Sequence, residues 1–198
     1  DVRPRGGEPN RLTDAERAEG WELLFDGQST ERWRGFRSEA FPEKGWRVED
    51  GALKVEGGGG DIITRAQYGD FELSFEWKIA PGANSGVMYR VGEEADATWQ
   101  TGPEYQVLDD DTHFDGGNTE TSAASLYALY VAEKANPFPP GQYNRGRIRV
   151  RDGRVEHWLN GRKVVDCLWG SDDWRARVEA SKFSAMPTFA TRERGHVA

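Results

Sequence analysis

A polar face on one short strand is the part of this sequence most suited to chemistry. Residues 102–107 are typical of a strand, and their alternation places Glu104 and Gln106 on one face and Tyr105 and Val107 on the other. A carboxylate beside an amide can bind a polyhydroxylated ligand, because the two groups together accept and donate hydrogen bonds. The same pattern also fits a surface strand whose polar face is solvated. The choice between the two depends on the elements around the strand.

Alternating apolar residues predict an antiparallel β-sandwich that would hold such a strand. The clearest strand covers residues 71–79, where five large apolar side chains share one face and polar side chains share the other. A sheet with a single buried face has this pattern. Tight turns are favoured at Asp50-Gly51, Asp152-Gly153 and Asn160-Gly161. We therefore predict an all-β fold, a two-sheet antiparallel β-sandwich of about a dozen strands, with one or two short helices.

Two helices and several further strands complete the predicted fold. Thr13 and Glu16 form a capping box for a short helix that ends at Gly20. Ser171 is the expected N-cap of a second helix over residues 171–181. Other strands are predicted at residues 21–25, 87–91 and 126–130.

Composition limits the kinds of partner that the chain can have. Its net charge of −8 argues against nucleic acid and anionic membranes, which require a basic surface. Its apolar stretches all fall short of the roughly 20 residues that a membrane helix needs. Cys167 is the only cysteine and is expected to be a buried, inert thiol. Residues 1–11 are predicted to be a flexible lead-in, and residues 12–198 a single β-sandwich domain.

A series of short motifs follows in order along the chain from Trp21 onward. They are Leu24-Phe25-Asp26-Gly27 with Trp33, Gly45-Trp46-Arg47-Val48-Glu49-Asp50-Gly51, Gly59-Gly60-Asp61-Ile62-Ile63-Thr64, Phe71-Glu72-Leu73 through Trp77-Lys78, Asn84-Ser85-Gly86-Val87 with Arg90, Gly102-Pro103-Glu104-Tyr105-Gln106-Val107-Leu108-Asp109, Glu156-His157-Trp158-Leu159-Asn160-Gly161 and Ser181-Lys182-Phe183. Together they resemble the 3-keto-disaccharide hydrolase domain family, whose fold is the concanavalin A-like lectin/glucanase jelly roll.

The resemblance implies a carbohydrate partner, namely glycosides oxidised at C3 of the sugar. It also implies a periplasmic or secreted protein, since many relatives are exported. The sequence begins at Asp1 without a methionine or a signal peptide, so we expect a mature form. It ends at Ala198, before the histidine-containing segment and final strand with which family members usually continue. The sequence does not specify the aglycone or the oligomeric state.

A ketone at C3 opens a particular route for breaking the glycosidic bond. It acidifies the hydrogen on C2, so a general base can form an enolate that expels the C1 substituent, after which water adds back. The site then needs a base and a group that stabilises the enolate oxygen. His157 is the first choice as base, because imidazole titrates near neutral pH, although its alternation with Val155 and Leu159 fits the core equally well. Glu104 is the alternative base or acid, or a metal ligand.

Other residues are predicted to bind the substrate. Arg90 and Lys182 are candidates for stabilising the enolate and binding hydroxyl groups, and each fits an ordinary surface charge as well. Glu76, Gln106 and Asn84 are further candidates for sugar contacts, with Asn84 also suited to a turn. At most one of three tryptophans is expected to stack on a sugar ring: Trp33, Trp99 or Trp158.

No cofactor is predicted with certainty. The acidic run of residues 109–111 with His113 offers oxygen ligands for a divalent metal such as calcium, or forms an unliganded loop. Two alternatives to the 3-keto enzyme stay open: a non-catalytic lectin-type binding module and an ordinary glucan hydrolase. The second alternative needs a carboxylate pair, and Gln106 and Leu108 interrupt any such pair within the strand of Glu104. A pair across strands, Glu104 with Glu76, stays open.

Overall fold

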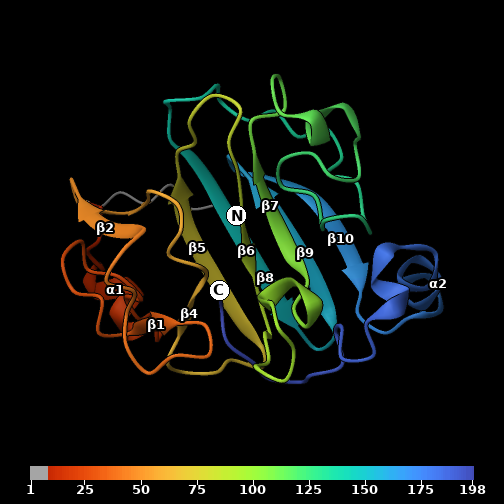
Figure 1. Cartoon of the computed structure of the whole chain (residues 1–198), viewed down its shortest axis with the longest axis horizontal. Helices are drawn as coiled ribbons and strands as arrows, with labels where there is room; N and C mark the ends of the chain where they lie inside the picture. The colour runs from red at the N-terminus through yellow and green to blue at the C-terminus, as the bar shows by residue number, and fades with distance from the viewer. Residues whose placement is uncertain (1–8) are drawn as a thin grey trace. The chain divides into compact units, whose positions relative to one another are not determined.

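The computed structural model describes residues 9–198, which form two compact units (Figure 1). The first unit extends to Gln67 and includes Ala198, and the second covers residues 68–197. Most of the lead-in predicted at residues 1–11 lies outside the described residues. A single domain over residues 12–198 stays a prediction, and each unit is described by itself.

The first unit holds one short helix and two pairs of strands. They are α1 (Asp14–Ala18), β1 (Trp33–Gly35) paired with β4 (Ile62–Thr64), and β2 (Trp46–Glu49) paired with β3 (Ala52–Val55). The predicted capping box is confirmed, since the Thr13 side chain accepts the Glu16 backbone N–H and Glu16 binds back to Thr13. The turn between β2 and β3 is also confirmed. Asp50 and Gly51 both have positive φ, 50° and 73°, as a primed turn requires.

The strand predicted at residues 21–25 is wrong, because this segment forms no strand. Its backbone is used in local contacts instead. The Trp21 N–H donates to the carbonyl of Glu16 at the end of α1 (3.0 Å), and the Leu24 carbonyl accepts the indole N–H of Trp33 (2.8 Å). A short apolar run becomes a strand only where a neighbouring strand pairs with it. None of the strands of residues 9–198 does so here.

The second unit is an antiparallel β-sandwich. One layer is a four-stranded sheet in the order β10-β9-β8-β5, and the other contains the pair β6-β7 (Figure 1). The strands are β5 (Phe71–Trp77), β6 (Asn84–Met88), β7 (Glu104–Leu108), β8 (Asn144–Arg151), β9 (Arg154–Leu159) and β10 (Arg162–Leu168). Four short helices connect or follow them: η1 (Thr98–Gln100), η2 (Phe114–Gly117), α2 (Asp172–Ala180) and η3 (Lys182–Ala185). The predicted all-β sandwich with few helices is confirmed.

The core lies between these two layers. Tyr105 of β7 packs edge-on against Phe75 of β5, with ring centroids 5.2 Å apart. The Tyr105 ring also lies 4.9 Å from the His157 ring of β9. Alternate residues of β8 and β9, such as Ile148 and Val155, are fully buried beside them. The alternation read from the sequence therefore assigns one face of each strand to the core.

Two other predicted strands differ in the structure. The strand predicted at residues 87–91 begins earlier, at Asn84, and ends at Met88, because Arg90 adopts a left-handed conformation with φ 53°. The segment 126–130 is a turn with isolated bridges instead of a strand. Ala128 has φ 57°, which an extended chain cannot accommodate. The structure shows ten strands among residues 9–198, where about a dozen were predicted.

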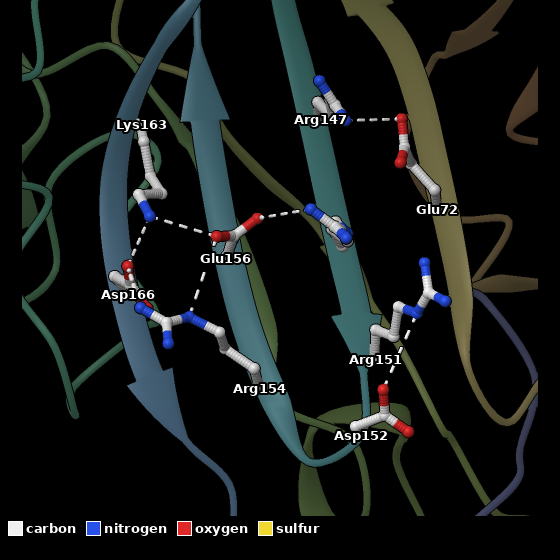
Figure 2. Close-up of polar contacts among 9 residues, drawn as sticks. Glu72, Arg147, Arg151, Asp152, Arg154, Glu156, Lys163 and Asp166 are labelled. Carbon is white, nitrogen blue, oxygen red and sulfur yellow. Dashed lines mark hydrogen bonds and ion pairs between the residues drawn. The ribbon is translucent and has the colours of Figure 1, made fainter. Parts of the chain in front are cut away.

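The face of the four-stranded sheet that points away from the core carries paired charges. Figure 2 shows Glu156 facing Lys163 (3.0 Å) and Arg154 (3.8 Å), and Arg147 bound to Glu72 (2.7 Å). Asp166 joins the same network through both Arg154 and Lys163. Each of these six charges therefore has an opposite charge within reach on this face.

None of the helices in the described part of the chain combines the length and the apolar character needed to cross a bilayer. Cys167 is buried and unpaired, and burial raises the pKa of its thiol to about 12. This thiol is therefore protonated at neutral pH and unreactive, as predicted.

Candidate functional site

A cavity of about 200 Å³ lies on the face of β6 and β7 that points away from the core. Seven residues bound it: Asn84, Met88, Trp99, Glu104, Gln106, Tyr127 and Lys182. Four of them, namely Asn84, Glu104, Gln106 and Lys182, were predicted from the sequence as site residues, and the structure brings these four together. All seven belong to the second unit.

The register of the β6-β7 pair determines which side chains lie next to one another at the base of this cavity. Met88 lies opposite Glu104, and Gly86 lies opposite Gln106. Because alternate residues share a face, Met88, Gly86 and Asn84 line up beside Glu104 and Gln106. Gly86 leaves the space that the Glu104 side chain occupies, since a Cβ atom at residue 86 would lie 1.8 Å from Glu104 Oε1. The missing side chain at Gly86 therefore permits this position of the carboxylate.

Gln106 borders the cavity from a buried position. Its side chain is fully buried, and its Nε2 donates to the carbonyl of Thr121 (3.2 Å). Its Oε1 has no hydrogen-bond donor among the described residues. A buried acceptor without a donor is costly. That oxygen is itself enclosed, so its unmet hydrogen bond is a local cost to stability and not an open contact for a ligand.

Lys182 is held on aromatic rings at the start of η3. Its Nζ lies 4.4 Å from the centre of the Tyr127 ring and 5.0 Å from that of Trp99, with the Phe183 ring at 5.3 Å. Such contacts favour the charged ammonium, by about 0.5–1 kcal/mol at exposed sites and by more when water is excluded. The cation is thereby fixed at the wall of the cavity, and Trp99 is the one of the three candidate tryptophans that lines it.

Tyr127 is a cavity residue that the sequence analysis missed. Its backbone N–H donates to the Glu104 carbonyl (3.0 Å), which ties it to the edge of β7. Burial raises the pKa of its hydroxyl, and so do the charges of Asp115 and Glu104. Only tryptophans were considered as aromatic sugar contacts. Tyr127 lies in the segment 126–130, which was interpreted as a strand, and nothing in that pattern indicates that its ring lines a cavity.

The structure does not bring His157 to this cavity. The imidazole is fully buried in the core, with Nε2 3.0 Å from the Tyr89 hydroxyl and Nδ1 3.1 Å from the Ala124 carbonyl. A carbonyl only accepts, so Nδ1 carries the proton and Nε2 accepts from Tyr89. Burial lowers the pKa of His157 to about 4. The predicted pairing of His157 with Glu104 as catalysts is thus not formed, because β9 directs His157 inward while β7 directs Glu104 outward.

Arg90 and Glu76 also lie away from the cavity. The Arg90 guanidinium donates to the carbonyl of Gly69 (3.2 Å), pairs with Asp70 (3.3 Å) and lies over the Trp169 ring. Glu76 pairs with Arg145 (3.3 Å) on the charged outward face of the four-stranded sheet. Neither is available to a ligand in the cavity, and the predicted cross-strand pair of Glu104 with Glu76 is not formed.

Carboxylates in the acidic run of residues 109–111 accept hydrogen bonds from nearby backbone and side-chain groups. The Asp109 carboxylate accepts the N–H groups of Gly82 (2.7 Å) and Asp111 (3.2 Å) and the Thr112 hydroxyl, which lower its pKa. Asp110 accepts the Ala123 N–H (2.8 Å). Among residues 9–198 there is no group of three or more His, Cys, Asp or Glu side chains placed to hold a metal ion. Calcium stays a prediction without such a ligand set.

Comparison with known families gives a match over most of the chain. Residues 20–198 match the 3-keto-alpha-glucoside-1,2-lyase-like domain. A curated protein of Bacteroides thetaiotaomicron, named 3-keto-disaccharide hydrolase, is 34% identical over 189 residues. The match covers 84% of this chain and 65% of that protein, so the chain spans less than two thirds of its relative.

Solved structures agree with this match. A candidate glycosyl hydrolase from Parabacteroides distasonis has a TM-score of 0.88 and 38% identity, with 95% of this chain and 90% of that chain covered. A second candidate glycosyl hydrolase of that organism has a TM-score of 0.62 at 24% identity, covering 84% of this chain and 89% of that one, and shares the fold. The resemblance found in the sequence is confirmed.

Proposed function

Because the chain belongs to the family of 3-keto-alpha-glucoside-1,2-lyase-like domains, we propose that its cavity cleaves the glycosidic bond of 3-keto-glycosides. The proposed route is removal of the C2 proton, elimination of the C1 substituent and addition of water. The observation that carries the proposal is the cavity that Glu104 and Lys182 both line. A base and a fixed cation at one site are what enolate chemistry requires. We further propose that the protein acts in the periplasm or outside the cell.

Glu104 is the general base in this proposal. It is the only carboxylate among the residues that bound the cavity. Its side chain is set over Gly86, where any larger residue would displace it. His157, the first choice from the sequence, is not part of the proposal, because its imidazole is enclosed in the core. An ordinary retaining hydrolase is disfavoured as well, since it needs a second carboxylate about 5 Å from the first.

Lys182 stabilises the enolate oxygen in this proposal. Removing the C2 proton moves negative charge onto the oxygen at C3, and a cation already in place lowers the energy of that state without reorganisation. The ring contacts at Tyr127 and Trp99 hold the ammonium in place before substrate binds. The sequence offered Arg90 and Lys182 for stabilising the enolate, and Lys182 takes that role in this proposal.

Asn84, Gln106 and Trp99 bind the sugar in this proposal. Gln106 and Asn84 offer amide groups for sugar hydroxyls, and the Trp99 ring offers an apolar face for a pyranose. The cavity of about 200 Å³ is smaller than the roughly 300–1,000 Å³ typical of sites for drug-sized ligands. A single oxidised sugar unit therefore fits it better than a long glycan does.

The test compares two glutamates on neighbouring layers. Glu104→Gln removes the base and keeps the shape of the side chain, so we expect kcat on a disaccharide oxidised at C3 to fall about 10²–10⁴-fold. Glu76→Gln is the matched control, because Glu76 lies on the outward face of the sheet and pairs with Arg145. It should leave turnover unchanged.

Three results would contradict the proposal. One is normal turnover by Glu104→Gln. A second is saturable sugar binding by the unaltered chain without any product, which would indicate a lectin-type module. The third is release of reducing ends from an unoxidised glucan, which would indicate an ordinary hydrolase.

A further inference from the structure

The elimination step has a requirement that Glu104 and Lys182 leave unmet. When the C1–O bond breaks, the oxygen of the leaving sugar takes both bonding electrons and needs a proton. Glu104 has at that moment just taken a proton from C2, and Lys182 is committed to the oxygen at C3. A proton donor at the leaving group is therefore the missing part of the site.

Tyr127 is the remaining residue of the cavity wall with an ionisable proton. Of the other lining residues, Met88 has no proton to give, and Asn84, Gln106 and Trp99 do not ionise near neutral pH. Tyr127 is anchored on both sides, by its backbone N–H on the Glu104 carbonyl (3.0 Å) and by the Lys182 ammonium 4.4 Å from its ring centre. Its position is thus coupled to the two residues of the proposed chemistry.

We propose that the Tyr127 hydroxyl is a catalytic acid that protonates the leaving sugar oxygen, an inference that rests on the proposed function. In the first half of the reaction, Glu104 takes the C2 proton, the C2–H electrons form the C1=C2 bond, and the C1–O electrons pass to the leaving oxygen. That oxygen receives the proton of Tyr127, which is left as a phenolate.

The second half restores both residues. Water adds to C1 of the unsaturated ketone and gives one proton to the Tyr127 phenolate. The electrons of the C1=C2 bond move toward the oxygen at C3 and then return to C2, which takes the proton that Glu104 holds. The sum is hydrolysis of the glycosidic bond, with Tyr127 again a phenol and Glu104 again a carboxylate, and no oxidant or reductant is consumed.

The surroundings of Tyr127 suit a donor. The pKa of Tyr127 lies above its ordinary value because of burial and the negative charges of Asp115 and Glu104. His113 lies beyond Asp115, with 3.9 Å between Nδ1 and the carboxylate, and Lys182 is the cation on the ring. The hydroxyl therefore holds its proton at neutral pH until a more basic oxygen, such as that of a departing sugar, comes within reach.

The experiment uses leaving groups of different basicity. Tyr127→Phe removes the hydroxyl and keeps the ring under Lys182. On a 3-keto-disaccharide, whose leaving alkoxide is strongly basic, we expect kcat to fall about 10²–10⁴-fold. On a 4-nitrophenyl 3-keto-glycoside, whose leaving phenolate needs no proton, kcat should fall less than about tenfold. Tyr143→Phe is the matched control, because Lys78 lies 4.8 Å from the centre of that exposed ring in the same way.

Each outcome bears on the inference. Equal loss on both substrates, or no loss on either, would overturn the role of Tyr127 while the activity of the unaltered chain still supported the proposed function. No cleavage of either substrate by the unaltered chain would overturn both.

A measurement without substrate gives a further test. The ultraviolet difference spectrum between the unaltered chain and Tyr127→Phe, followed against pH, should show a phenol that ionises above about pH 10. Ionisation at or below that pH would contradict the role.

Discussion

The two faces of strand β7 differ in what their polar groups do. On one face, Glu104 and Gln106 line a cavity, and Gln106 Oε1 has no donor among the described residues. On the other face, Tyr105 packs against His157, whose two ring nitrogens are both hydrogen-bonded. The first arrangement borders open space, and the second uses its hydrogen-bonding capacity within the protein. Polar residues at a site are thus distinguished by whether they border open space that a ligand can enter.

The largest expected difference between the two faces of β7 is in stability, and it comes from His157 on the core side. The pKa of His157 is about 4 when folded and about 6.5 in the unfolded chain, so only the unfolded chain takes up the proton between these values. The His157 contribution to stability is therefore present above pH 6.5 and is lost as the pH falls toward 4, by about 3 kcal/mol. Urea unfolding at pH 7 and pH 4 should show this loss in the unaltered chain.

The variant His157→Gln should lack that pH-dependent loss, because an amide does not titrate. It should be less stable at pH 7 by about 1–3 kcal/mol, through the broken hydrogen bonds to Tyr89 and Ala124. Its folded fraction should keep its activity. Equal pH dependence in the two proteins, or a hundredfold loss of kcat in folded His157→Gln, would remove the distinction between the two faces.

Gly86→Ala tests the cavity face, where we expect activity to change and stability to stay nearly the same. The added Cβ would lie 1.8 Å from Glu104 Oε1, and the flexible carboxylate moves more easily than the backbone does. Because a displacement of about 1 Å at a reacting group can cost about a hundredfold, we expect kcat to fall about 10²-fold with little change in melting temperature. A large loss of stability with normal turnover per folded molecule would show that Gly86 serves packing instead.

Glu72→Gln on the outward face of the four-stranded sheet should have the smallest effect. Glu72 pairs with Arg147 at 2.7 Å, and both side chains are partly exposed. Pairs of this kind contribute about 0–1 kcal/mol, and salt reduces them further. At low and at high salt, the free energy of unfolding of this variant should differ from that of the unaltered chain by less than about 1 kcal/mol. The turnover of the two proteins should be equal. Any marked loss of activity would place a functional surface on that face.

Local patterns were sufficient for most strands of the second unit and for part of the cavity. Dipeptides such as Asp152-Gly153 specify tight turns through their positive φ values, 49° and 75°, and the alternation of β7 placed Glu104 and Gln106 together. Lys182 was found through the family motif alone. These features depend on neighbours in the sequence, or on a motif that carries them.

Long-range contacts decided the rest. His157 alternates with apolar residues, and only the packing of β7 over β9 shows that its face is the core. Tyr127 was missed because residues 126–130 were interpreted as a strand. In the structure the Ala128 N–H bonds to the Glu120 carbonyl (2.8 Å), and the left-handed residue there turns the chain. Neither contact leaves a periodic signal in the sequence.

The most direct test of the central claim is exchange of the C2 hydrogen. A 3-keto-glucoside with a carbon–carbon bond at C1 cannot lose that substituent, so a C2 proton that the protein removes is replaced by deuterium from D₂O. The C4 hydrogen, which is also next to the ketone, exchanges without the protein and is followed separately. Nuclear magnetic resonance should show deuterium entering C2 in the presence of the unaltered chain, above the rate without protein. Glu104→Gln should slow this exchange about 10²-fold or more, and exchange at the unaltered rate in that variant would contradict Glu104 as the base.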